Sequence, residues 1–92
     1  METATKPFSL GRIVITANAK QSLVMDDVLP ALRRHQRGDW GHVGRRNAAL
    51  NDDALLTDCR ILSAYIDRND VRFWIITEAD RSVTTVLLPE DY

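Results

Sequence analysis

Three side chains that could hold a metal ion lie in one short segment. His35, Asp39 and His42 follow one another with the spacing H-x3-D-x2-H, and imidazole and carboxylate groups are common ligands of transition metals. Two glycines, Gly38 and Gly41, interrupt any helix that would align the three groups, and the sequence suggests no fourth ligand. We therefore expect no metal and no other cofactor. The simpler interpretation is that His35 caps a helix end and that His42 lies at the surface.

The same segment is strongly cationic. Between positions 33 and 46 it contains five arginines and one acid, Asp39, which gives it a net charge of +4. Because the whole chain has a formal net charge of −1, the remaining residues carry −5. A cationic, glycine-containing loop on an otherwise acidic domain indicates a surface that meets an anionic partner, and nucleic acid is one such partner. We predict that this basic patch consists of Arg33, Arg34, Arg37, Arg45 and Arg46.

The loop from Gly38 to Gly41 is expected to be a rigid structural turn. Asp39 would accept hydrogen bonds from backbone N–H groups, as aspartates commonly do in turns. An exposed Trp40 would stack on a base or anchor an interface, whereas a buried one would fill the core beneath the loop. Because large aromatic side chains are mostly buried, we expect Trp40 to pack inward. Asn51 is expected to hydrogen bond the backbone of this loop.

Residues for nucleophilic or acid–base catalysis are sparse. Ser63, Cys59 or Thr77 would each need a histidine partner, and none is close in sequence. The chain has no G-x-S-x-G motif, no P-loop and no dinucleotide fingerprint. Metal-independent ribonucleases use sets of acid–base and cationic groups such as Glu78, Asp80, Arg81, Thr84 and Thr85. The simpler interpretation of this set is a solvated hairpin in which Arg81 pairs with an acid.

Acidic residues outside the arginine segment form a second candidate surface. They could engage a basic groove that normally holds nucleic acid, or they could simply keep the domain soluble. They are Asp52, Asp53, Asp58, Asp67, Asp70, Glu78, Asp80, Glu90 and Asp91. The contact surface that we select from this region consists of Asp52, Asp53, Glu78, Asp80 and Arg81.

Length and composition predict one globular domain over residues 1–92, with residues 1–8 flexible. The chain is 45% hydrophobic and 27% charged, which is ordinary for a globular protein. Its single cysteine, Cys59, excludes an internal disulfide and a cysteine-based zinc site, and a reducing compartment fits best. No apolar run approaches the ~20 residues of a membrane span, and the first ten residues lack a signal-peptide core. We therefore expect a cytoplasmic protein that does not bind membranes.

Four strands and three helices are predicted to position these residues. Period-two alternation predicts strands over 10–16, 59–66, 71–77 and 83–88, with Phe73 and Ile75 on one face of the third and Trp74 and Ile76 on the other. Helices are predicted over 17–23, from 26 or 27 to 36, and from 43 or 44 to 56. The fold class is α+β: a small two-layer domain whose antiparallel sheet of three to four strands has helices on one face.

Details of the helix ends follow from residue types. Thr16 is expected to cap the first helix and Asp26 or Asp27 the second, with Pro30 in the second helix's first turn. Gly38 is expected to end the second helix. The buried stripe of the third helix is predicted to contain Val43, Leu50 and Ala54.

Five stretches resemble a family of small bacterial proteins carried on plasmids, phages and integrated elements. They are L-G-x-I-V-x-T (Leu10–Thr16), R-H-Q-x-G-D-W-G (Arg34–Gly41), N-D-x-A-L (Asn51–Leu55), R-I-L-S-A-Y (Arg60–Tyr65) and W-I-I-T-E-A-D-R-S-x-T-T-x-L-L-P-E-x-Y (Trp74–Tyr92). Members are often labelled plasmid-related and sometimes type I restriction methylase subunits, but this chain is too short for a methyltransferase and has no glycine-rich cofactor loop. Position 47, often acidic in the family, is Asn47 here. The resemblance implies a mobile-element accessory protein.

Two classes of function remain. The first is stoichiometric binding that inhibits a protein complex of a host defence system, of the anti-CRISPR or anti-restriction type, with no catalysis. The second is a small metal-independent ribonuclease or an RNA-binding protein centred on the arginine segment, in which His35 or His42 would pair with Arg81.

Overall fold

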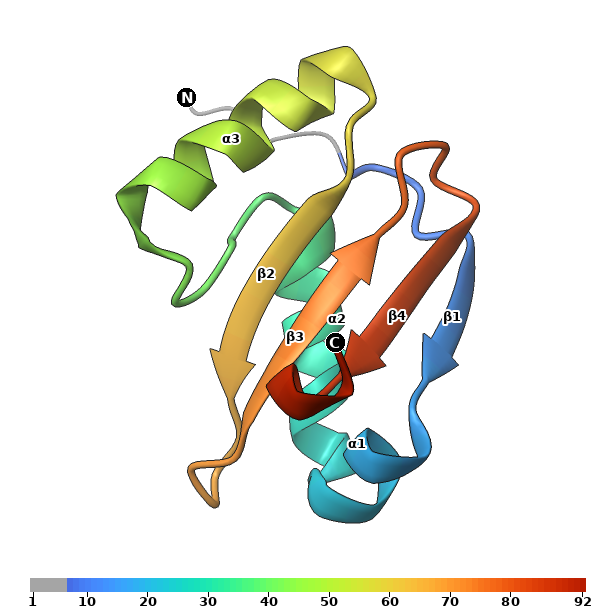
Figure 1. Cartoon of the computed structure of the whole chain (residues 1–92), viewed down its shortest axis with the longest axis vertical. Coiled ribbons are helices and arrows are strands. Elements are labelled where there is room, and N and C mark those ends of the chain that lie inside the picture. Colours follow the sequence, from blue (N-terminus) through green and yellow to red (C-terminus); the bar gives the residue numbers. More distant parts are fainter. Residues whose placement is uncertain (1–6) are drawn as a thin grey trace.

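The computed structural model describes residues 7–92 and confirms a small α+β fold (Figure 1). Residues 1–6, most of the segment predicted to be flexible, lie outside the described residues. Phe8 lies inside them and is held in place, because its backbone N–H and C=O both bond to Gln36. The elements are β1 (Arg12–Ile15), α1 (Ala17–Ser22), α2 (Met25–Gln36), α3 (Gly44–Thr57), β2 (Ile61–Ile66), β3 (Arg72–Thr77), β4 (Val83–Leu87) and the 3-10 turn η1 (Pro89–Asp91).

The four strands form one sheet in the order β1-β4-β3-β2. The last three strands make the predicted antiparallel meander, with Ser63 opposite Ile75 and Ile75 opposite Val86. The prediction of an antiparallel sheet is wrong for β1, which pairs parallel to β4. Short connections force neighbouring strands to be antiparallel, but β1 reaches the rest of the sheet through three helices, and such a long crossover permits parallel pairing.

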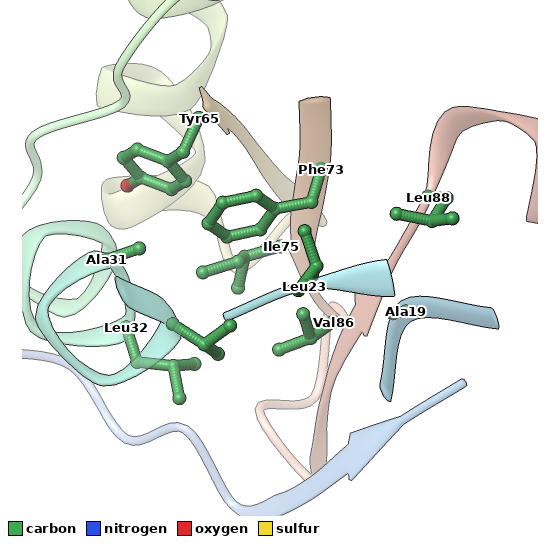
Figure 2. Packing of buried hydrophobic residues seen from close by; sticks show 10 residues of the cluster. Ala19, Leu23, Ala31, Leu32, Tyr65, Phe73, Ile75, Val86 and Leu88 are labelled. Carbon is green, nitrogen blue, oxygen red and sulfur yellow. The ribbon is translucent and has the colours of Figure 1, made fainter. Parts of the chain in front are cut away.

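Helices α1 and α2 cover one face of the sheet, which we call the inner face. In Figure 1 the viewer looks onto the opposite, outer face, and α2 lies behind the sheet. Alternate strand residues such as Phe73, Ile75 and Val86 point inward and pack against Ala31 and Leu32 of α2 (Figure 2). This apolar layer holds α2 in a fixed position against the sheet.

The first inner-face helix, α1, has a side-chain cap at its start, whereas α2 has none. The hydroxyl of Thr16 accepts a bond from the Ala19 N–H at 3.1 Å, which confirms the predicted cap of α1. The cap predicted for α2 is wrong: the helix begins one residue earlier than Asp26, after Val24, whose N–H donates to the buried carboxylate of Asp67. Pro30 consequently lies in the second turn of α2 rather than the first. The helix ends at Gln36, just before Gly38 as expected.

Helix α3 lies beside β2, beyond the edge of the sheet. Asn51 donates to the Leu62 carbonyl at 2.7 Å and accepts from the Leu62 N–H at 3.3 Å, so its amide pairs with the edge strand as another peptide would. Farther along β2, Ala64 pairs with the loop before α3, at Gly41. A Cβ at Gly41 would lie 2.0 Å from the Ala64 oxygen, and its φ is +69°, so only glycine fits there.

The buried side of α3 differs from the predicted stripe. Ala54 is buried and Val43 partly buried, but Leu50 is 57% exposed. Asn51 occupies the buried position instead, because its side chain can bond the open edge of β2 whereas a leucine cannot. None of the helices found within residues 7–92 is long and apolar enough to cross a lipid bilayer.

Candidate functional site

Folding brings His35 beside two hydroxyl groups, although the three residues are far apart in sequence. The Nδ1 atom lies 2.5 Å from the Ser63 hydroxyl, and Nε2 lies 2.8 Å from the Thr77 hydroxyl. Thr77 in turn contacts the Thr84 hydroxyl at 2.7 Å, and Thr84 donates to the carbonyl of Leu10 at 2.7 Å. A chain of hydrogen bonds therefore crosses the inner face from β2 to the segment before β1.

The number of available protons fixes which group donates in each of these hydrogen bonds. Each hydroxyl has one proton, and the proton of Thr84 is used on Leu10. Thr77 must therefore donate to Thr84, so its oxygen accepts a proton from Nε2 of His35. The imidazole is the neutral Nε2–H tautomer, and Ser63 donates to its Nδ1.

His35 is consequently a structural residue of the core. Its side chain is 0% exposed, and burial, with a smaller contribution from the Arg81 charge, lowers its pKa from 6.5 to about 4. The prediction that His35 caps a helix end is wrong, because its ring points from α2 into the sheet. In the folded protein Ser63 and Thr77 do contact a histidine, although none lies close to them in the sequence. All three side chains are fully buried, however, and no substrate can reach them.

The Gly38–Gly41 loop is held from both sides. Trp40 is 5% exposed, which confirms the inward packing, and its indole N–H donates to Asp52 at 3.0 Å. Asp39 accepts one backbone bond, from Gly41 at 3.3 Å, but its main partner is the guanidinium of Arg34 at 2.7 Å. This ion pair is about half exposed and lowers the pKa of Asp39. Asn51 bonds β2 rather than this loop, contrary to expectation.

Arg81 ties the β3–β4 turn to the C-terminal end of α3. Its guanidinium donates to the carbonyls of Ala54 and Cys59 at 2.9 and 2.7 Å, and also to two carbonyls of its own turn. Within the described residues, the expected pairing of Arg81 with an acid is not formed. Asp80 instead accepts bonds from the backbone and hydroxyl of Ser82, and the hydroxyl bond lowers its pKa. Of the predicted acidic surface, Asp52, Asp53 and Asp80 are exposed and Glu78 is partly buried.

The five arginines of the predicted basic patch divide between two helix ends. Arg33 and Arg34 lie in the last turn of α2 and Arg37 caps it, on the inner-face side, whereas Arg45 and Arg46 lie in the first turn of α3 beside β2. All five are exposed. Arg34 is occupied by Asp39, and its guanidinium also lies 4.9 Å from the centre of the Tyr65 ring. Whether these arginines bind a partner stays a prediction.

The outer face of the sheet carries a different cluster, which we call the outer strip. Its floor consists of alternate residues of β2 and β3 that point away from the helical layer. Two hollows run along it, of about 290 and 270 Å³, bordered by α3 and the loop before it. The strip comprises His42, Asn47, Leu50, Arg60, Leu62, Ala64, Ile66, Arg72 and Trp74, with Tyr92 on the far side.

The outer strip combines flat apolar groups with unneutralised cations. The rings of Trp74 and Tyr92 meet edge to face at 5.6 Å, and the Arg60 guanidinium lies 5.5 Å from the centre of the Tyr92 ring. Neither hollow, as lined by residues 7–92, contains a carboxylate. Within the same residues, Arg60 and Arg72 form no ion pair, since the ion pairs found there involve Arg34 and Arg68.

A third hollow, of about 340 Å³, lies between α2 and the β2–β3 turn and has the opposite character. Its lining includes Arg68 and Asp27, which pair at 2.8 Å, and hydrogen bonds from the guanidinium and the backbone N–H of Arg68 lower the pKa of Asp27. Asp67 also lines it and accepts three backbone N–H bonds within the molecule. The charges of this hollow are therefore neutralised internally.

Apart from His42, the residues of the outer strip were not expected to form a site. A signal was present, because Trp74 alternates in phase with Arg72, and Leu62 in phase with Arg60. A strand that is apolar on both faces, in a domain with helices on one side only, leaves one of those faces uncovered. Arginines in phase with that face mark it as charged as well.

No group of three His, Cys, Asp or Glu side chains within residues 7–92 could hold a metal ion. His35 and Asp39, two of the residues suggested as ligands, have the partners described above, and His42 is exposed on the outer strip as expected. No family model, no curated protein and no solved structure matches the chain. The resemblance of residues 10–92 to a mobile-element family therefore stays a prediction, and the site is interpreted from its own geometry.

Proposed function

We propose that the protein acts by stoichiometric binding, as an accessory protein of a mobile genetic element that inhibits a host defence complex. The observation that supports it best is the outer strip: an uncovered, partly apolar surface whose arginines have no acidic partner among residues 7–92. Exposed apolar groups bordered by polar ones are typical of interaction sites. The resemblance to mobile-element proteins is what directs the proposal toward defence complexes.

The positions of the polar residues also favour binding over catalysis. His35 has both ring nitrogens bonded inside the core, and the guanidinium of Arg81 is bonded to backbone carbonyls. Neither is placed to act on a bound phosphate. Occlusion needs only about 800 Å² per partner, which is about one-seventh of the 5911 Å² surface of the domain.

The test is a titration of purified protein against a purified type I restriction enzyme and a purified CRISPR effector. We expect inhibition of one of them to saturate near one protein per site, and Arg72→Glu to remove it. Lys20→Glu is the matched control, since it makes the same charge change at an exposed position of α1, outside both the outer strip and the predicted basic patch. Inhibition by far less than one protein per site would indicate catalysis and contradict the proposal, as would no inhibition of either complex.

A ribonuclease is the second candidate, and one observation favours it. His42 is exposed and lines the same hollow as Arg72 and Trp74, so a potential acid–base group lies beside a cation. The test is RNA cleavage in EDTA. Cleavage that is lost in His42→Ala, while the melting temperature is unchanged, would support the nuclease over stoichiometric binding.

A further inference from the structure

We propose that the outer strip binds single-stranded nucleic acid, with bases stacked on Trp74 and Tyr92 and phosphates held by Arg60 and Arg72. This inference rests on the proposed function in taking the outer strip as the contact surface, and it names the chemistry of the occupant. In a defence complex the occupant would be an unpaired guide or target strand.

The first support is the arrangement of planar groups. Arg60, Tyr92 and Trp74 follow one another with separations of 5.5 and 5.6 Å, and all three present planar groups. Aromatic rings and guanidinium planes are the groups on which proteins stack unpaired bases, and every base has a flat face to offer. An acidic peptide, which would also satisfy the arginines, makes no comparable use of these rings.

The second support is the sign and position of the charges. Arg60 lies before β2 and Arg72 begins β3, so the two cations mark opposite ends of the strip, one at each hollow. Arg45 and Arg46, at the start of α3, add positive charge along the same border. A nucleic-acid strand carries a negative charge at every residue and can contact both ends at once, which a single small anion cannot do.

The third support is the size of the two hollows. At about 290 and 270 Å³ they lie near the lower limit of small-ligand pockets, about 300 Å³. Each therefore has room for a flat group of the size of a base. Leu62, Ala64 and Ile66 form an apolar floor between them, and Ile66 is 42% exposed. Duplex nucleic acid, whose bases are already stacked and paired, cannot fill such hollows.

The experiment measures binding of labelled single-stranded RNA and DNA of the same sequence, about ten nucleotides long, by fluorescence anisotropy. We expect binding at about 50 mM salt that weakens about tenfold at about 200 mM. Arg72→Glu and Trp74→Ala should each weaken binding about tenfold or more, whereas Lys20→Glu on α1, outside the strip and the predicted basic patch, should change it less than twofold. The two oligonucleotides distinguish RNA from DNA as the preferred strand.

Tryptophan fluorescence provides a second readout in case Trp74→Ala perturbs folding. Trp40 is buried and Trp74 lines the strip, so an oligonucleotide should quench the unmodified protein and not Trp74→Phe. No binding of either oligonucleotide at low salt, or equal weakening by Lys20→Glu and Arg72→Glu, would overturn the inference. If oligonucleotides do not bind but Arg72→Glu still abolishes inhibition of a defence complex, the strip contacts protein and the proposed function survives. If oligonucleotides bind and no complex is inhibited, the strip binds nucleic acid as inferred and only the proposed inhibition of a defence complex is wrong.

Discussion

The two faces of the sheet use polar residues in opposite ways. On the inner face every buried polar side chain within residues 7–92 has a hydrogen-bond partner, and the chain from Ser63 through His35 to Leu10 is complete. On the outer face Arg60 and Arg72 lie beside exposed apolar groups, and the described part of the chain gives them no acidic partner. The residue types that suggest catalysis thus stabilise the core, whereas the surface suited to binding consists of residues that look ordinary in sequence.

The change expected to have the largest effect on stability is His35→Ala. It leaves a cavity and removes the partner of both Ser63 and Thr77, so the free energy of unfolding should fall by about 3–5 kcal/mol. Chemical denaturation monitored by Trp40 fluorescence would measure it. A loss below about 1 kcal/mol would show that the chain of hydrogen bonds does not support the core.

Acid should destabilise the protein through the same side chain. The pKa of His35 is about 4 in the folded state and about 6.5 in the unfolded chain, so the unfolded state binds the extra proton between these values. Stability is therefore fully present above pH 6.5 and falls by about 3 kcal/mol as the pH drops to about 4. Denaturation midpoints measured across this range provide the test. His35→Gln, which cannot titrate, should remove most of the slope, and an unchanged slope would contradict the assignment.

A smaller loss of stability is expected when the contact between Asn51 and the edge strand β2 is removed. Asn51→Ala leaves the N–H and C=O of Leu62 without their partner, so it should cost about 1–3 kcal/mol. Asn47→Ala is the control, since Asn47 is exposed and bonds only its own helix, at the Val43 carbonyl. Thermal unfolding of both variants would compare them, and equal melting temperatures would mean that Asn51 does not secure α3.

Asp39→Ala should have a modest effect on the loop. The Arg34–Asp39 pair is about half exposed and Asp39 holds a single backbone N–H, so we expect a loss of about 0.5–1 kcal/mol. Acrylamide should still quench Trp40 poorly in this variant, because Asp52 and the core hold the indole. Free quenching of Trp40 would show that Asp39 is needed to close the loop.

The smallest effect on stability is expected on the outer face. Arg72 is exposed and forms no ion pair with any residue from 7 to 92, so Arg72→Glu should change the free energy of unfolding by less than about 0.5 kcal/mol. This measurement and the binding experiments together test the difference between the two faces of the sheet. Substitutions on the inner face should lower the free energy of unfolding, and substitutions in the outer strip should weaken binding alone. A large loss of stability in Arg72→Glu would remove the distinction between the faces.

Much of the fold follows from local sequence patterns. Alternation located β2, β3 and β4, and Thr16 and Gly38 correctly marked the ends of helices, because these signals arise within a few residues. The direction of β1 could not be read in the same way. It depends on which strand completes the sheet after three helices have packed, and that is a property of the whole domain.

The candidate site was less predictable than the fold. The partners of His35 come from β2 and β3, 28 and 42 residues away, so no spacing rule could identify them. Asp39 was expected to bond backbone N–H groups and Asp52 to form part of an acidic surface, yet their side-chain partners are Arg34 and Trp40. A candidate residue becomes available for function only when the fold gives it no internal partner, and long-range contacts decide that.

The pairing of Asn51 and Gly41 with β2 has a consequence for self-association. Sheets join edge to edge, and a domain with two open edges can polymerise without limit. Here the outward backbone groups of Leu62 and Ala64 are already bonded. The opposite edge, β1, is four residues long and pairs with β4 on one side only, from Arg12 opposite Val83 to Ile15 opposite Val86. A domain with one open edge can join a second copy but cannot extend into a filament, so the loop and helix that flank the outer strip also terminate the sheet.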